Sequence, residues 1–137
     1  MEKIVPIEWN ISFEVGHPLI ESDHEELFKN VNEFMAAVRC NAGQGATKKA
    51  LHRARSYAEY HFEHEEQIMM RERYNGLGAH KILHADFISA IATYSDRFIQ
   101  SHVDANDFLF YLRSWIENHI LVYDRQFGVF LKNNRAK

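Results

Sequence analysis

The chain has 137 residues, 46% of them hydrophobic, which is enough for one domain that buries about two thirds of its unfolded surface. Its 19 acidic and 16 basic side chains leave a net charge of −3 with histidine neutral. Because this charge is small and scattered, it argues against a nucleic-acid partner or a charged membrane surface. We expect a single domain over residues 1–137.

Nothing in the sequence predicts export or membrane insertion. No run of residues approaches the ~20 uninterrupted apolar positions of a membrane-spanning helix. The N-terminal residues contain no apolar block of the kind found in a secretory signal. The single cysteine, Cys40, cannot form a disulfide within the chain, which is compatible with a reducing compartment. We therefore expect a cytoplasmic protein.

Residues 1–17 are predicted to form an extended N-terminal arm. Their apolar side chains alternate as in a β-strand, but a lone strand would have no partner with which to pair. We therefore expect the arm to pack on a helical body. Its apolar residues are Ile4, Val5, Ile7, Trp9, Ile11, Phe13 and Val15.

The first predicted helix spans residues 18–40, with Pro18 in its first turn. Apolar residues follow His24 at steps of three and four, which is the period of a helix with one buried face. Two glycines in residues 41–46 predict a loop. Thr47 is the predicted N-cap of a second helix, which runs to about Arg73.

A second pair of glycines, within residues 75–78, predicts the next break, and a third helix follows over about 79–100. Asp104 is the predicted N-cap of a fourth helix that ends at about Leu131. Short loops make consecutive helices antiparallel neighbours. The expected fold is therefore all-α: an up-down-up-down antiparallel four-helix bundle over 18–131, preceded by the extended N-terminal arm.

Each of the four predicted helices carries imidazole or carboxylate groups on its apolar stripe. These groups belong to His24, His61, Glu65, His80, His84, His119 and Asp124. A buried polar group without a partner costs about 1–3 kcal/mol, so four helices that bring such groups inward need a shared partner. Imidazole and carboxylate in this number suit a pair of iron ions better than one metal ion.

The spacings along the second and fourth predicted helices decide which side chains can belong to this ligand set. His64 lies about 60° around the helix from His61, and Glu65 is closer to the same face, so we leave His64 out. His119 and Asp124 are five residues apart, which separates them by about 140° in an ideal helix. Either Asp124 reaches round from the side of the stripe, which we favour, or a local π-bulge brings it in.

With these ligands in place, the chain resembles a single-domain bacterial hemerythrin. The resembling stretches are Ile-Glu-Ser-Asp-His-Glu-Glu-Leu-Phe (20–28), His-Phe-Glu-His-Glu-Glu (61–66), His-Lys-Ile-Leu-His-Ala-Asp-Phe (80–87) and Trp-Ile-Glu-Asn-His-Ile-Leu-Val-Tyr-Asp (115–124). They come in the order of the family and cover nearly the whole chain, including Trp9 in the arm. The departures are Glu21 and Asp23, since the family often has Ile-Asp-x-Gln-His before the first ligand.

The resemblance implies the role of each ligand. One iron would be bound by His80, His84 and His119, and the other by His24 and His61. The two irons would share Glu65 and Asp124 as bridges, with a hydroxide or oxide as a third bridge. The second iron would keep an open position for reversible binding of dioxygen. The resemblance also places Ile116 beside the bound oxygen. Trp115 faces the same layer, although an ordinary core role suits it better.

Carrier and enzyme remain alternatives from the sequence. Neutral imidazoles favour the Fe(II) and Fe(III) states over higher oxidation states, and no polar residue besides the ligands stands out on the stripes as a general acid or base. We therefore expect an oxygen-binding protein for storage, delivery or sensing, acting as a monomer and not as an enzyme, with an unknown protein recipient of its oxygen. The alternative is a di-iron enzyme that reduces peroxide or nitric oxide, or an iron-handling protein.

Overall fold

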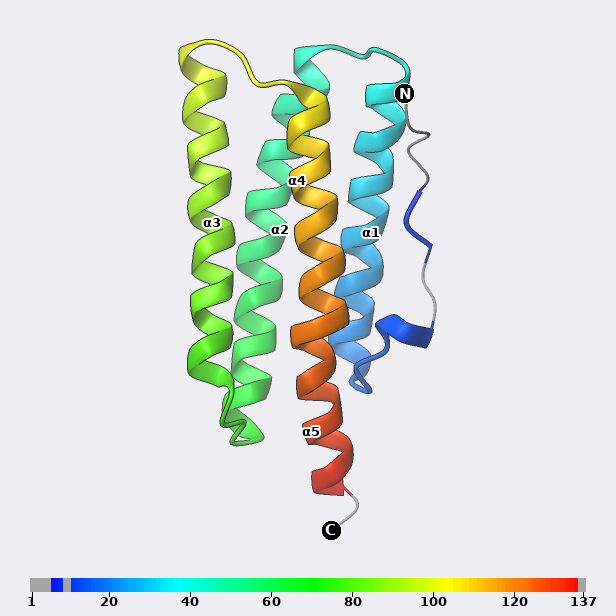
Figure 1. The fold of residues 1–137 in the computed structure, drawn as a ribbon, viewed down its shortest axis with the longest axis vertical. Coiled ribbons are helices and arrows are strands. Elements are labelled where there is room, and N and C mark those ends of the chain that lie inside the picture. Colours follow the sequence, from blue (N-terminus) through cyan, green and yellow to red (C-terminus); the bar gives the residue numbers. More distant parts are fainter. Residues whose placement is uncertain (1–5, 9–10, 136–137) are drawn as a thin grey trace.

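The computed structural model describes residues 6–8 and 11–135. Four long helical stretches lie side by side and alternate in direction, so the predicted all-α, up-down-up-down bundle is confirmed (Figure 1). The stretches are α1 (Pro18–Arg39), α2 (Gln44–Arg71), α3 (Leu77–Gln100) and a last rod made of α4 (Ala105–Asn118), η2 (His119–Asp124) and α5 (Arg125–Arg135). In the described part of the chain, no helix is long and apolar enough to cross a membrane.

The starts of α1 and α4 agree with the prediction from the sequence, and the start of α2 differs from it. Pro18 lies in the first turn of α1, and the Asp104 carboxylate accepts a hydrogen bond from the backbone N–H of Asp107, as an N-cap does. The predicted cap at Thr47 is wrong, because α2 begins at Gln44 and Thr47 is fully buried within it. Gly43 has a positive φ of 84°, which turns the chain directly into the helix.

The break between α2 and α3 lies two residues earlier in the chain than predicted. Helix α2 ends at Arg71, two residues before the predicted end. Helix α3 begins at Leu77, so that Gly78 lies inside its first turn rather than in the loop. The chain reverses through Arg73, whose φ is +56°, a conformation more often taken by glycine.

The last rod contains a π-helical turn at the metal ligands. Residues His119–Asp124 form η2, where backbone bonds span five residues: the N–H of Arg125 donates to the carbonyl of Ile120. Our preference for an ordinary helix with Asp124 reaching round was wrong. The wider turn places residues five apart on one face, so His119 and Asp124 point the same way.

Two apolar clusters lie on either side of the ligand layer. The large cluster includes Leu27, Phe34, Leu51, Phe62, Phe108 and Ile116. The small cluster consists of Val15, Ile20, Ile68, Met69, Phe127 and Leu131. On α1, for example, Ile20 belongs to the small cluster, His24 comes next, and Leu27 belongs to the large cluster. The ligand layer is therefore closed off by packed side chains at both ends.

The described part of the N-terminal arm packs on the bundle, as expected. Its short 3₁₀ turn η1 (Ile11–Phe13) precedes Val15, which belongs to the small cluster. Asn32 pairs with both the N–H and the carbonyl of Ile7, at 2.9 Å each. A Cβ at Gly128 would lie 2.6 Å from the Val15 carbonyl, so α5 needs glycine there to let the arm approach. Trp9, with Ile4 and Val5, lies outside the described residues.

Candidate metal centre

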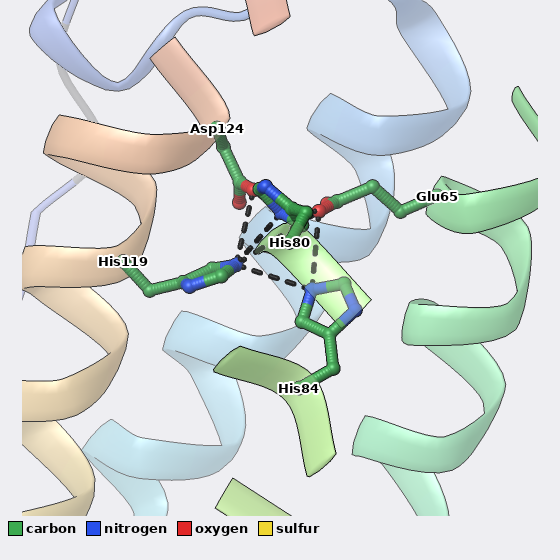
Figure 2. A group of neighbouring side chains, drawn as sticks. All are labelled: Glu65, His80, His84, His119 and Asp124. Carbon is green, nitrogen blue, oxygen red and sulfur yellow. Dashed lines mark hydrogen bonds and ion pairs between the residues drawn. The ribbon is translucent and has the colours of Figure 1, made fainter. Parts of the chain in front are cut away.

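All seven predicted ligands converge in the middle of the bundle as two overlapping groups. The three-histidine group comprises Glu65, His80, His84, His119 and Asp124 (Figure 2). The two-histidine group comprises His24, His61, Glu65 and Asp124. Within each group the donor atoms lie within 4.8 Å of one another. Every side chain of both groups is buried, so water does not compete for these donors.

Glu65 presents a different oxygen to each group. Its Oε1 lies 2.5 Å from Nε2 of His80 and 3.3 Å from Nε2 of His84, both in the three-histidine group. Its Oε2 lies 3.0 Å from Nε2 of His61 and 3.7 Å from Nε2 of His24, both in the two-histidine group. The carboxylate therefore spans the boundary between the groups.

Asp124 divides its oxygens in the same way. Its Oδ1 lies 2.8 Å from Nε2 of His80 and 3.1 Å from Nε2 of His119. Its Oδ2 lies 3.0 Å from Nε2 of His24. Two carboxylates that each offer one oxygen to each histidine group have the arrangement of bridges between two metal ions.

The spacing of the imidazole nitrogens fits a metal ion. Nε2 of His119 lies 3.1 Å from Nε2 of His80 and 3.2 Å from Nε2 of His84. Two nitrogens bound at right angles to one ion, each at ~2.1 Å, lie ~3.0 Å apart. Three neutral imidazoles whose Nε2 atoms meet cannot all be paired by hydrogen bonds to one another, since each has only one N–H donor. The donor set and its spacing therefore suit a cation better than a hydrogen-bonded cluster.

The pKa values of the histidines in the metal-free centre also favour a bound cation. Burial lowers the pKa of His61, but the charge of Glu65 and the hydrogen bond to Asp23 outweigh it and raise the pKa to about 10. Burial also lowers the pKa of His80, and its bonds to Asp124 and Glu65 raise it to about 9. Without metal, these buried carboxylates therefore hold protons on the imidazoles, and a bound cation takes over that positive charge.

The pKa values of the two carboxylates, Glu65 and Asp124, are shifted downward, opposite to those of the histidines. Burial raises the pKa of Glu65 and of Asp124, but the surrounding histidines outweigh burial and hold both pKa values below the ordinary range. Both side chains are thus ionised at neutral pH, which is the form that binds metal.

Two further carboxylates, Asp23 and Glu66, contact the outer nitrogens of the ligand histidines. The sequence drew attention to Asp23 as a departure from the family pattern beside His24, but not to its contact with His61. Nδ1 of His61 lies 3.1 Å from the Asp23 carboxylate, and Nδ1 of His84 lies 2.8 Å from that of Glu66. The members of each pair lie on different helices and far apart in the sequence, so no local spacing indicates them. His64 lies outside both groups and contacts Asp23 at 3.2 Å.

Aromatic rings hold two of the imidazoles on the three-histidine side. Phe62 stacks on His84 with ring centroids 3.8 Å apart, and Trp115 stacks on His119 at 4.4 Å. Ile116 is almost fully buried, with 1% of its surface exposed. Trp115 therefore contacts a ligand of the three-histidine group, while Ile116 is part of the large apolar cluster.

Comparison with known proteins places the chain in a family. The model of the family described as hemerythrin HHE cation binding domain matches residues 15–129. The chain belongs to the hemerythrin family. It is 27% identical over 130 residues to bacteriohemerythrin from Clostridium acetobutylicum, a match that covers 87% of this chain and 96% of the relative. It is 25% identical to myohemerythrin from Theromyzon tessulatum, over 84% of this chain and 85% of that one.

Solved structures agree on the fold. A crystal structure of a hemerythrin with a leucine-to-tyrosine mutation matches with a TM-score of 0.80 at 24% identity, over 89% of this chain and 94% of that chain. Membership of the hemerythrin family, together with the buried His, Glu and Asp cluster, makes this a di-iron, oxygen-binding protein. The alternative of a di-iron enzyme or iron-handling protein is not favoured.

The structure also locates the two departures from the family pattern. Glu21 accepts hydrogen bonds from the backbone N–H groups of Val15 and Gly16, at 3.1 Å each, and so fixes the end of the arm. Asp23 contacts His61, a member of the two-histidine group. Of the two departures, only Asp23 contacts a residue of the metal centre.

Proposed function

We propose that His80, His84 and His119 bind one iron, that His24 and His61 bind the other, and that Glu65 and Asp124 bridge the two with a hydroxide or oxide. The observation that carries this assignment is the division of each carboxylate between the two histidine groups. Neither group is complete without both carboxylates, which supports one coupled centre over two separate metal sites.

The two groups supply unequal numbers of donors. The three-histidine group offers five side chains to its iron, whereas the two-histidine group offers four. The iron of the two-histidine group is therefore the one with room for an external ligand. When bound, two Fe(II) ions supply the electrons for reversible binding of dioxygen without an external reductant.

The residues around the centre keep it dry and in place. Stacking of Phe62 on His84 and of Trp115 on His119 restricts the rotation of both rings. We propose Ile116 and Trp115 as the wall of the oxygen pocket, with Ile116 excluding water and Trp115 acting through His119. Exclusion of water slows the loss of bound oxygen by protonation.

We further propose that the protein works as a monomer in the cytoplasm, where it stores or delivers oxygen or reports on it to a separate protein. The small net charge of −3 supports a small-molecule ligand over nucleic acid.

The test is to load the protein with Fe(II) under anaerobic conditions, measure iron per chain, and record the visible and near-ultraviolet spectrum before and after admitting oxygen. We expect two irons per chain and a new absorption band that disappears when oxygen is removed. One zinc per chain, or an oxidation that removal of oxygen does not reverse, would contradict the proposal.

A further inference from the structure

Asp23 is a buried acidic residue that is not among the proposed ligands. It lies on α1 directly before His24, with 7% of its surface exposed. Among the residues that the structure describes, every other buried carboxylate belongs to the metal centre. A buried charge is costly unless it is paired, so its partners indicate what it does.

The Asp23 carboxylate joins a proposed ligand to a histidine outside the centre. Its Oδ2 lies 3.1 Å from Nδ1 of His61 and 3.2 Å from Nδ1 of His64. His61 is buried, whereas the His64 side chain is 24% exposed. The backbone carbonyl of Asp23 accepts a hydrogen bond from the Tyr57 hydroxyl, so the main chain is also fixed at this residue.

These contacts determine which nitrogen of His61 faces the metal. An imidazole that donates its Nδ1 proton to a carboxylate keeps the lone pair on Nε2, and that is the atom turned toward Glu65, at 3.0 Å. A carboxylate acceptor also makes the imidazole a stronger donor to a metal ion than a neutral acceptor does. Asp23 is therefore placed where it can both orient His61 and strengthen it as a ligand.

We propose that Asp23 is the positioning residue of the two-histidine iron: it holds His61 with Nε2 toward the metal, and His64 and Tyr57 hold Asp23 in turn. The inference rests on the proposed ligand set and assigns an outer partner to the iron that binds oxygen. In the three-histidine group, the corresponding contact is made by Glu66, which is partly exposed.

The test uses the di-iron protein and follows the release of each iron to a chelator under anaerobic conditions. In Asp23→Ala we expect one of the two irons to leave about ten- to a hundredfold faster than in the wild type, and the other at an unchanged rate. Asp23→Asn should give a smaller effect on the same iron, because its amide oxygen can still accept one hydrogen bond. Anomalous scattering at the iron edge from partly depleted crystals identifies which iron has left.

Glu33→Ala is the matched control. Glu33 also joins α1 to α2, through Arg53 at 2.6 Å, but it is exposed and contacts no histidine of the centre. Its release rates should equal those of the wild type. If Asp23→Ala does not fold, Asp23→Asn carries the test with the same expected preference.

The outcomes separate this inference from the proposed function. A wild type that does not hold two irons would refute the ligand set itself. Two irons in the wild type with unchanged release in both Asp23 variants would overturn the role of Asp23 alone. Equal acceleration of both irons, or selective loss of the three-histidine iron, would also overturn it, because a general loosening of the fold would then be the explanation.

Discussion

The two halves of the metal centre share their carboxylates but differ in how many imidazoles surround them. Helix α3 supplies two histidines one turn apart, and η2 adds a third, so the three-histidine group is crowded. Helices α1 and α2 supply only one histidine each to the two-histidine group. The spacing of the candidate ligands along each helix thus places five donor side chains in one group and four in the other, within a single buried layer.

The surroundings of the two halves differ as well. On the three-histidine side, aromatic rings stack on His84 and His119, and the outer carboxylate Glu66 is 26% exposed. On the two-histidine side, the outer carboxylate Asp23 is buried and is shared by two histidines. The two-histidine group, which we propose leaves a position open for oxygen, is therefore the one whose outer carboxylate is shielded from solvent.

The largest expected effect comes from removing a group that both halves share. Glu65→Ala takes one oxygen from each histidine group, and we expect the protein to lose iron or keep a mixed, unstable site. Iron per chain after gel filtration measures this. Glu59→Ala is the matched control, because this exposed carboxylate on the same helix pairs with Arg55 and should leave two irons bound. Unchanged iron in Glu65→Ala would show that Glu65 is not a bridge.

Removal of both metals should destabilise the whole bundle. A ligand at a free concentration 1,000 times its dissociation constant stabilises the folded state by about 4 kcal/mol, and two irons act together. We expect the iron-free protein to melt at least about 10 °C below the di-iron form. Differential scanning calorimetry of the two forms measures the difference, and equal melting temperatures would refute the coupling of metal binding to folding.

Opening the proposed oxygen pocket should lower the stability of the protein and shorten the lifetime of its oxygenated form. Ile116→Ala creates a cavity in a packed core and should cost about 2–5 kcal/mol of stability. If Ile116 shields bound oxygen from water, the absorption band of the oxygenated protein should also decay faster. Leu109→Ala, at another buried position of α4, controls for the loss of packing alone. Equal decay of the two variants would make Ile116 an ordinary core residue.

The effect furthest removed from oxygen binding is the pH dependence of the iron-free protein. Its His61 and His80 have pKa values of about 10 and about 9, both above the value of about 6.5 in the unfolded chain. Their contribution to stability is fully present below pH 6.5 and is lost as the pH rises to about 9–10. The di-iron form has the opposite trend at the acidic end, because protonated imidazole cannot bind iron.

Urea unfolding of both forms between pH 6 and pH 10 measures this difference. The iron-free protein should become less stable across the range, while the di-iron form should not follow it. Iron-free stability that rises with pH over this range would contradict the raised pKa values of His61 and His80.

The sequence predicted most of the fold because the relevant signals are local. Apolar residues at three- and four-residue steps identified all four helices and their inward faces, and the ligands on those faces all converge in the structure. The π-helical turn at Asp124 could not be chosen from the sequence, since the five-residue step from His119 allows both alternatives. The early start of α2 depends on the positive φ of Gly43, which composition does not reveal.

The contact between Asp23 and His61 could not be predicted from the sequence for a different reason. His61 lies 38 residues away on another helix, so their contact arises only when α1 and α2 pack together. A charged residue beside a ligand on a helix is usually solvent-facing, and nothing in its local pattern indicated burial.

The most direct measurement of the central claim is anomalous diffraction at the iron edge from crystals loaded anaerobically with Fe(II). The account predicts two iron peaks, one at Nε2 of His80, His84 and His119 and one at Nε2 of His24 and His61, with one oxygen of each carboxylate at either peak. A single peak, or a second peak away from His24 and His61, would contradict a di-iron centre made of one full and one open site.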